Sequence, residues 1–155
     1  MTAQGRSSSK HGRIAQRGVA AIETALVLLL FITLVYGIAT FGAVFYTQQV
    51  VSRAAEDGAR ALTALNSPFA SGSVPGTTGA VQSVVWDSMA SSLIVPAASN
   101  GSAAARRSWL AANVPVVVAS NGLVTVSYPY AANRILNISA PWEPATIVGR
   151  ARLSL

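Results

Sequence analysis

The side chains that most often carry out catalysis are scarce in this sequence. Cysteine is absent, and the only histidine and the only lysine, His11 and Lys10, lie together in a basic N-terminal segment. Disulfides, zinc thiolate sites and thiol nucleophiles are therefore excluded, and a serine nucleophile would have to take its base from that segment. Beyond residue 65 the only carboxylates are Asp87 and Glu143, which are expected to be solvated surface groups. We therefore expect no catalytic residues, no metal site, no cofactor and no small-molecule substrate.

One carboxylate stands out because of its position. Glu23 is the only formally charged residue between Arg17 and Arg53, and it follows Gly18 by five residues at the start of a long apolar run. A carboxylate that enters a membrane costs about 3 kcal/mol unless it is paired. Glu23 therefore needs either a partner or a place at the membrane surface. The simpler interpretation is that it lies at the start of a helix, near the interface, where the helix dipole favours a negative charge.

The apolar run that follows, residues 24–46, contains no charge and no proline. As a helix it is long enough to cross a hydrocarbon core of about 30 Å, which takes about 20 apolar residues. It is too long to be only the apolar region of a cleavable signal peptide. Residues 1–17, which lie before Glu23 and the run, carry four basic residues and no acid. This charge predicts a cytoplasmic N-terminus and places the later residues outside the cytoplasmic membrane. These basic residues are Arg6, Lys10, Arg13 and Arg17.

The composition agrees with a membrane protein better than with a nucleic-acid-binding protein. Charged residues make up 10% of the 155 residues, against roughly 25% in an ordinary soluble domain. The net charge of +6 comes mostly from residues 1–18, which carry four of the eleven basic residues, whereas residues 19–155 carry seven basic against five acidic residues. The basic excess therefore indicates membrane topology, and we expect no nucleic-acid partner.

The helical pattern continues past the membrane-spanning run. Residues 47–65 contain no proline, and small or apolar residues recur there at steps of three or four, as one helical face requires. Two i,i+4 pairs of opposite charge, Arg53 with Asp57 and Glu56 with Arg60, are expected on the wetter side. The expected face consists of Val50, Ala54, Gly58, Ala61 and Leu65.

These patterns divide the chain into four parts. Residues 1–18 form a basic cytoplasmic leader that is expected to be disordered, because nothing in it can form a core. Residues 19–65 form one long helix, and residues 66–79 form a linker rich in Gly, Pro, Ser and Thr. Residues 80–155 form a small extracytoplasmic domain.

Helices and strands are both expected in the extracytoplasmic domain. Apolar spacing predicts helices over residues 80–95 and 103–114. Two β-rich runs flank Asn121-Gly122, which is a strong hairpin signal, and residues 145–155 are expected to hold a third strand. The predicted fold class is therefore α+β, with a long N-terminal helix whose first half spans the membrane.

The segment from Arg17 to Leu26, RGVAAIETAL, resembles the prepilin signature of type IV pilins and their relatives. In that family a membrane aspartyl peptidase cuts after the glycine. The resemblance therefore implies cleavage between Gly18 and Val19, which leaves Glu23 as the fifth residue of the mature chain.

Over about residues 17–62 the sequence further resembles the TadE-like family, the minor pseudopilins of tight-adherence pilus systems. The later segment VTVSYPY, residues 124–130, is similar to the tail region of that family. Major pilins of this class often carry an aromatic residue after the glutamate, and Thr24 stands there instead, which favours a minor subunit. The resemblance implies a membrane-anchored pseudopilin-like subunit for assembly of a Tad/Flp-type pilus.

The resemblance also implies a location and a set of partners. The protein would lie in the bacterial cytoplasmic membrane as a single-pass protein, or enter the pilus. Its partners would be the lipid bilayer, the prepilin peptidase, other pilin or pseudopilin subunits, and the pilus assembly platform.

Two kinds of contact are expected in such an assembly. Cleavage would create an α-amine at Val19 with a pKa near 7.7–8.0, and Glu23 of a neighbouring subunit could pair with it, since opposite charges attract more strongly out of water. Pairs of small residues spaced by four let helices approach closely, although alanine is abundant throughout the chain. The expected helix-packing positions are Ala39, Ala43, Ala54 and Gly58.

Two alternatives remain open at this stage. The chain could be an uncleaved single-pass envelope protein with an interaction domain. It could also be a secreted binding module that is cleaved after Ala39.

Overall fold

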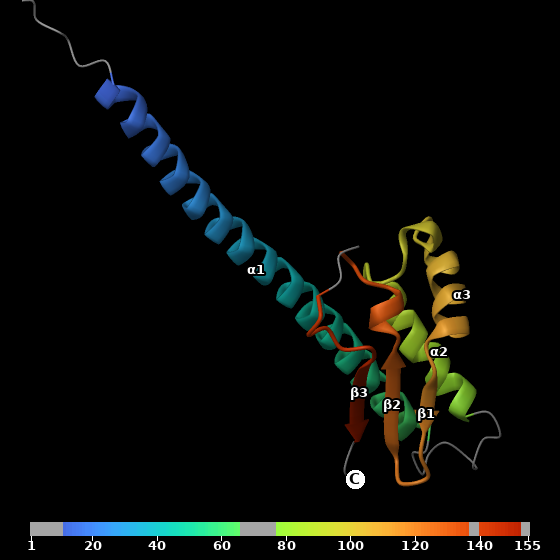
Figure 1. Ribbon diagram of the computed structural model, residues 1–155. Helices are drawn as coiled ribbons and strands as arrows, with labels where there is room; N and C mark the ends of the chain where they lie inside the picture. Colours follow the sequence, from blue (N-terminus) through green and yellow to red (C-terminus); the bar gives the residue numbers. More distant parts are fainter. Residues whose placement is uncertain (1–10, 66–76, 137–139, 153–155) are drawn as a thin grey trace, which may run out of the picture. The chain divides into compact units, whose positions relative to one another are not determined.

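The computed structural model describes residues 11–65, 77–136 and 140–152. The chain divides into two compact units, residues 1–39 and residues 40–155, and each is described by itself. The elements in chain order are α1 (His11–Leu65), α2 (Thr77–Ala90), η1 (Ala97–Ser99), α3 (Ala103–Asn113), β1 (Val116–Val118), β2 (Leu123–Tyr128), η2 (Tyr130–Ala132) and β3 (Ile147–Arg152) (Figure 1). The α+β fold class expected from the sequence is confirmed.

The first unit is helical over all its described residues, which belong to α1. The helix begins at His11, earlier than the expected start at Val19, because no proline separates the basic leader from the apolar run and a helix propagates readily once formed. Residues 1–10 lie outside the described residues. The predicted leader is thus helical over residues 11–18.

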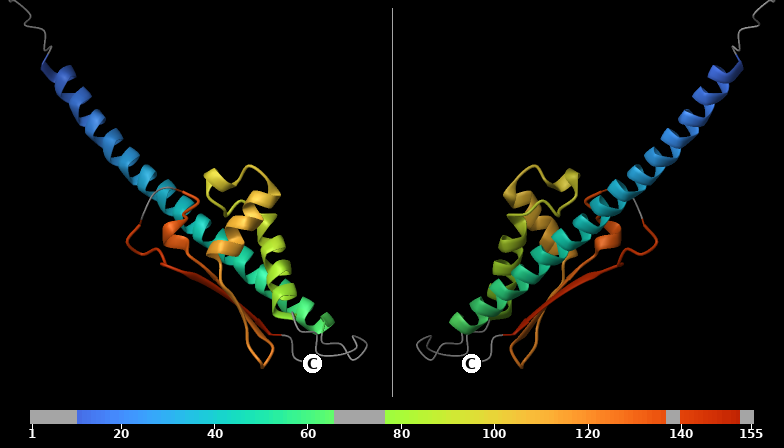
Figure 2. Two further views of the ribbon diagram at one scale, coloured as in Figure 1. Left: turned by 90° about the vertical axis from the view of Figure 1, so that its right-hand side faces the viewer. Right: turned by 90° about the vertical axis from the view of Figure 1, so that its left-hand side faces the viewer.

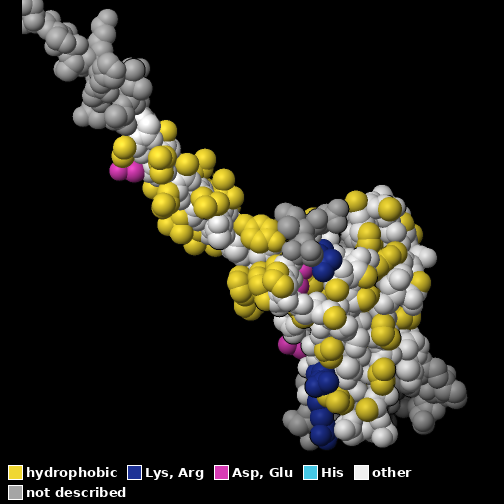
Figure 3. All heavy atoms as spheres, viewed as in Figure 1, with side chains coloured by type: hydrophobic (Ala, Val, Ile, Leu, Met, Phe, Trp, Pro, Cys, Tyr) yellow, Lys and Arg dark blue, Asp and Glu magenta, His cyan; other side chains and the backbone are white. Residues whose placement is uncertain are grey.

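The apolar side chains of the first unit are exposed, as Figure 3 shows for the face in view. From Gly18 onward α1 is long and apolar enough to cross a membrane, and none of its most apolar window is buried. The threonine hydroxyls of this run donate to the carbonyl oxygens one turn earlier, Thr24 to Ala20 and Thr33 to Leu29, both at 2.8 Å. These polar groups therefore need no water inside a bilayer. The exposed residues include Val19, Ile22, Leu26, Val27, Leu28, Leu29, Leu30, Phe31, Ile32, Leu34, Val35 and Ile38.

The second unit is built on a three-stranded antiparallel sheet in the order β1-β2-β3. Side chains alternate along β2, so that Val124, Val126 and Tyr128 are buried while the residues between them are only half-buried. One face of the sheet therefore carries the core, as period-two alternation requires.

Two helices cover the buried face of the sheet, and α3 packs on α2 (Figure 2). The part of α1 from Thr40 to Leu65 lies against β2 and β3, while Gln82 and Trp86 of α2 donate hydrogen bonds to the carbonyl oxygens of Val116 and Val114. The core consists mainly of Val51, Ala54, Ala55, Ala59, Leu62, Val81, Val85, Met89, Ile94, Leu110, Val114, Val124, Val126, Tyr128, Tyr130 and Ile147.

The buried face of α1 is wider than the sequence pattern predicts. Ala54 and Gly58 are buried as expected, but Val50 and Leu65 are only half-buried. The centre of the face lies about one residue further along, because α2 and the sheet contact the helix from two directions and so cover a broader stripe. The α1 side chains with at most 1% exposure are Thr40, Thr47, Val51, Ala54, Ala55 and Ala59.

The predicted hairpin is confirmed. β1 and β2 pair in register with Val116 opposite Val126, and Gly122 has a φ of +78°, a conformation that glycine adopts without strain. The Asn121 side chain accepts a hydrogen bond from the Leu123 amide at 3.1 Å. The expected helices and the third strand are also present, at the bounds given above for α2, α3 and β3. The predicted linker, residues 66–79, overlaps the first turn of α2, and its residues 66–76 lie outside the described residues.

Glycine residues allow the closest contacts that α1 makes with α2, β2 and β3. A Cβ atom built on Gly149 of β3 would lie 2.5 Å from the carbonyl oxygen of Val51, so strand and helix backbones meet directly there. A Cβ atom on Gly58 would lie 2.7 Å from Val85 of α2 and 3.2 Å from Val124 of β2. These distances are shorter than an ordinary van der Waals contact, so a Cβ atom at either glycine would overlap its neighbours.

Tyr128 ties three segments of the second unit together. Its side chain is fully buried, and its hydroxyl donates to the carbonyl oxygens of Ile94 and Asn133, the latter at 3.2 Å. Burial raises the pKa of Tyr128 well above its ordinary value of 10.0, and the neighbouring Tyr130 raises it further. The folded state therefore holds this phenol proton more tightly than the unfolded state does.

Tyr128→Phe tests this arrangement through the pH dependence of stability. Because the folded pKa is raised, the contribution is complete below about pH 10 and is lost as the pH rises above it. We expect the variant to lose about 1–2 kcal/mol of unfolding free energy at neutral pH, since the buried carbonyl of Ile94 loses its donor. Its further loss above pH 10 should be shallower than that of the wild type. Denaturant unfolding followed by near-UV circular dichroism would measure both, and an equally steep alkaline loss in the variant would contradict the assignment.

Candidate functional site

The residues of the predicted processing motif lie on successive turns of α1 in the first unit. Gly18 is exposed, and a Cβ atom built on it would meet no atom within 4 Å. Val19 is 58% exposed. Val19 and Glu23 are spaced i,i+4, so they share one face of the helix. The peptide bond after Gly18 is therefore uncovered within this unit.

Glu23 is exposed and forms no ion pair with any side chain described from Gly18 onward. In the intact chain α1 begins at His11, so Glu23 lies well beyond the first turn. The helix dipole acts mainly over that first turn, so it gives this carboxylate little support. If the helix enters a membrane, its apolar surroundings leave Glu23 with an unrelieved desolvation cost.

The four predicted helix-packing positions fall into two groups. Ala39, in the first unit, is exposed, and Ala43, in the second, is half-buried. Ala54 and Gly58 lie instead in the core of the second unit, where Gly58 receives Val85 and Val124 of the same chain. The small size of Gly58 thus lets α2 and β2 of the same chain pack closely against α1. Of the four positions, Ala39 and Ala43 keep surface that another helix can reach.

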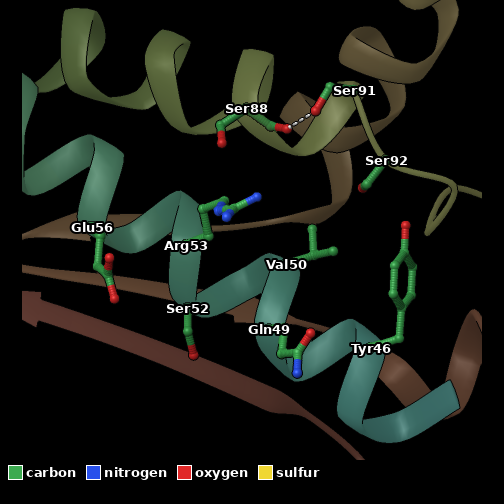
Figure 4. Close-up of a pocket in the computed structure, with 9 residues that line it drawn as sticks. All are labelled: Tyr46, Gln49, Val50, Ser52, Arg53, Glu56, Ser88, Ser91 and Ser92. Carbon is green, nitrogen blue, oxygen red and sulfur yellow. Dashed lines mark hydrogen bonds between the residues drawn. The ribbon is translucent and has the colours of Figure 1, made fainter. Parts of the chain in front are cut away.

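A polar groove of about 620 Å³ lies between α1 and the end of α2 in the second unit (Figure 4). The Ser88 hydroxyl donates to Asp57 at 2.7 Å, and those of Ser91 and Ser92 donate to backbone carbonyls one turn earlier. The described lining contains no histidine or lysine, and its hydroxyl groups offer polar contacts. It is lined by Tyr46, Gln49, Val50, Ser52, Arg53, Glu56, Ser88, Ser91 and Ser92.

Ion pairs in this unit differ in part from the expected ones. Arg60 lies 3.8 Å from Glu56, as expected, but Asp57 pairs with Arg60 at 3.3 Å, and no Arg53–Asp57 pair is present among the described side chains. The two late carboxylates also differ from each other. Asp87 is exposed and pairs with Arg107 at 2.8 Å.

The expectation that Glu143 is a solvated surface group is wrong. Its side chain is only 3% exposed, and Arg134 donates to it at 2.6 Å from Nε to Oε2. The two residues are nine positions apart in the sequence, outside the range of helical spacing rules, so the pairing could not be read from the sequence. Its effect reaches Tyr130, whose pKa is raised by burial and by the Glu143 charge and lowered by Arg134.

Sequence reasoning also missed an aromatic cluster in the second unit. Trp142 stacks on Phe41 of α1 with ring centroids 4.1 Å apart and an interplanar angle of 11°, and Phe45 lies 6.5 Å from Phe41. All three rings are at least 43% exposed. The position of Phe41 and Phe45 at the end of the apolar run was the available signal, but nothing in the sequence pointed to Trp142 as their neighbour.

The N-terminal part of the chain is similar to a known protein family. Residues 18–60 match the family model described as TadE-like protein. This segment is TadE-like. No curated protein and no solved structure matches the chain significantly.

The TadE-like segment contains Gly18, Val19 and Glu23 of the predicted processing motif, the whole apolar run and the first buried turns of α1 in the second unit. The match agrees with a membrane-anchored component, since α1 is long and apolar enough to span a membrane. VTVSYPY, residues 124–130, lies outside the match. In the fold it forms most of β2 and the start of η2, with its alternate side chains in the core.

Proposed function

We propose that this chain is a structural, pseudopilin-like subunit that takes part in assembling a tight-adherence pilus. Its apolar helix anchors it in the bacterial cytoplasmic membrane with the N-terminus inside and the second unit outside. Prepilin peptidase processes it after Gly18. It then contacts other pilin or pseudopilin subunits and the assembly platform, and it performs no catalytic step itself.

The observation that carries this proposal is the lone carboxylate of Glu23 on an exposed apolar helix, inside a TadE-like match that begins at Gly18. A helix that only anchors a domain gains nothing from a carboxylate inside the bilayer, because placing this charge there costs about 3 kcal/mol. A partner that neutralises the acid in an assembly accounts for it.

Processing would supply that partner. Cleavage between Gly18 and Val19 frees an α-amine that is largely cationic at neutral pH. Glu23 of one subunit then pairs with Val19 of its neighbour. Since the two residues are four positions apart, the pairing offsets the two helices by about 6 Å along their axes. A charge pair of this kind fixes a register that apolar side chains alone define poorly.

The proposed cleavage after Gly18 is tested by identifying the first residue of the mature protein. Mass spectrometry of the protein isolated from its own cells is expected to find Val19 as the first residue, with or without N-methylation. Gly18→Leu should keep the leader attached, because a large side chain replaces the residue before the cut. The conservative Ala20→Ser, two residues after it, should be processed normally. Detection of Met1 in the wild type would contradict the proposed processing and support an uncleaved envelope anchor.

A second candidate follows from the boundary between the units. The second unit begins at Thr40, directly after the Gly37-Ile38-Ala39 sequence at which a secreted binding module would be cut. A secreted module would then keep its whole described core, because all the core residues follow Thr40. The same mass spectrum separates this case, since it would show Thr40 as the first residue.

A further inference from the structure

The cluster of Phe41, Phe45 and Trp142 joins residues that are far apart in the sequence. Trp142 lies flat on Phe41, and the two rings are 43% and 50% exposed, while Phe45 is 62% exposed. Large apolar rings placed together on a surface usually mark a site of contact with a protein or a membrane.

The segment that carries Trp142 is held firmly in place. Glu143, the next residue, is buried and paired with Arg134 at 2.6 Å. The Glu143 amide donates to the Ala140 carbonyl at 3.1 Å, and the Ala145 carbonyl accepts from the Ala131 amide at 3.1 Å. The indole ring is therefore presented by a fixed turn, so little conformational entropy remains to be lost when it is covered.

The chemistry of the cluster fits a membrane interface. Phe41, Phe45 and Tyr46 belong to the end of the apolar run 24–46 and so lie where a spanning helix leaves the hydrocarbon. Trp and Tyr are enriched at that depth, because an apolar ring with a polar edge suits the headgroup region. The charges next to Trp142 cancel, since Arg134 neutralises Glu143, which lowers the cost of approaching the lipid.

We propose that Trp142, together with Phe41 and Phe45, inserts into the headgroup region of the outer leaflet, so that the second unit rests directly on the lipid surface. This inference rests on the proposed membrane anchoring. Lipid is favoured over a partner protein because two of the three rings, those of Phe41 and Phe45, belong to the spanning run itself. The unit thus has a fixed contact with the bilayer in addition to its helix.

Fluorescence quenching by brominated lipid tests the contact. The full chain is reconstituted at high dilution into phosphatidylcholine vesicles with bromine either near the carbonyl end of the acyl chain or near its methyl end. The emission of Trp142 is the difference between the wild type and Trp142→Phe. We expect the shallow bromines to remove roughly twofold more of this emission than the deep ones. Trp109→Phe is the matched control, and this variant should keep the whole of the quenchable signal.

A nitroxide label gives an independent measurement, because the chain has no native cysteine. The label on Trp142→Cys should be more accessible to dissolved oxygen than the label on Val117→Cys, an exposed apolar position on β1. If the chain resists carbonate extraction from the vesicles but Trp142 is not quenched, the inference is overturned while the anchor stands. If the chain is extracted, the anchoring itself fails and the inference fails with it.

Discussion

Glu23→Gln is expected to abolish pilus assembly while leaving the mature N-terminus at Val19. The amide keeps the size and hydrogen-bonding capacity of the side chain but removes its charge, so it cannot pair with the α-amine of a neighbouring subunit. An ion pair in surroundings of low dielectric that loses one partner costs about 3–5 kcal/mol, and a contact repeated between subunits multiplies that loss. Immunoblots of surface and membrane fractions, combined with mass spectrometry of the N-terminus, would measure the effect.

The matched control for this variant is Thr24→Ser at the neighbouring position. It keeps a hydroxyl that can donate to the carbonyl of Ala20 and should assemble as the wild type does. Glu23→Asp keeps the charge on a shorter side chain and should retain part of the assembly. Normal assembly by the Gln variant would show that the charge of Glu23 is dispensable and would leave the simple membrane anchor as the better description.

Gly149→Ala is expected to cost at least about 3 kcal/mol of the unfolding free energy of the second unit. The new Cβ atom would lie 2.5 Å from the Val51 carbonyl oxygen and 3.0 Å from the Ser52 amide nitrogen. Both are backbone atoms of α1, so no side-chain rotation relieves the overlap and β3 must move away from the helix. Denaturant unfolding of the full chain in detergent, followed by near-UV circular dichroism, would report the loss.

Gly79→Ala in α2 is the control for this prediction. A Cβ atom on Gly79 meets nothing within 4 Å, and alanine favours a helix over glycine by up to about 1 kcal/mol. This variant should therefore be as stable as the wild type or slightly more stable. A similar small change in both variants would mean that β3 does not lie against the α1 backbone as described.

Local patterns predicted much of this fold. The charge-free run from residue 24 to residue 46 predicted the long helix, and Asn121-Gly122 predicted the hairpin, because both signals depend on neighbours in the sequence. The predicted processing motif depends on sequence neighbours in the same way, because Gly18, Val19 and Glu23 lie within two turns of one helix.

Contacts between distant segments could not be predicted in this way. No spacing rule connects Glu143 with Arg134 or Trp142 with Phe41. These contacts form only because the fold brings the turn at residues 140–143 against α1 and against Arg134. Gly58 shows the related difficulty. Its small size correctly indicated a close approach, but the sequence could not say whether the partner was another subunit or α2 of the same chain.

The position of β3 has a consequence for how this protein is made. The Gln48 side chain donates to the carbonyl oxygen of Val148, 100 residues later in the chain. At the usual rates of synthesis, roughly 5–20 s pass between the appearance of these two residues, and contacts of such separation also form slowly. Until α2, β2 and β3 have been made in turn, the face of α1 that they will bury is only partly covered. Alanine and glycine at Ala54, Ala55, Gly58 and Ala59 keep the apolar area exposed meanwhile small, which limits aggregation before the sheet closes.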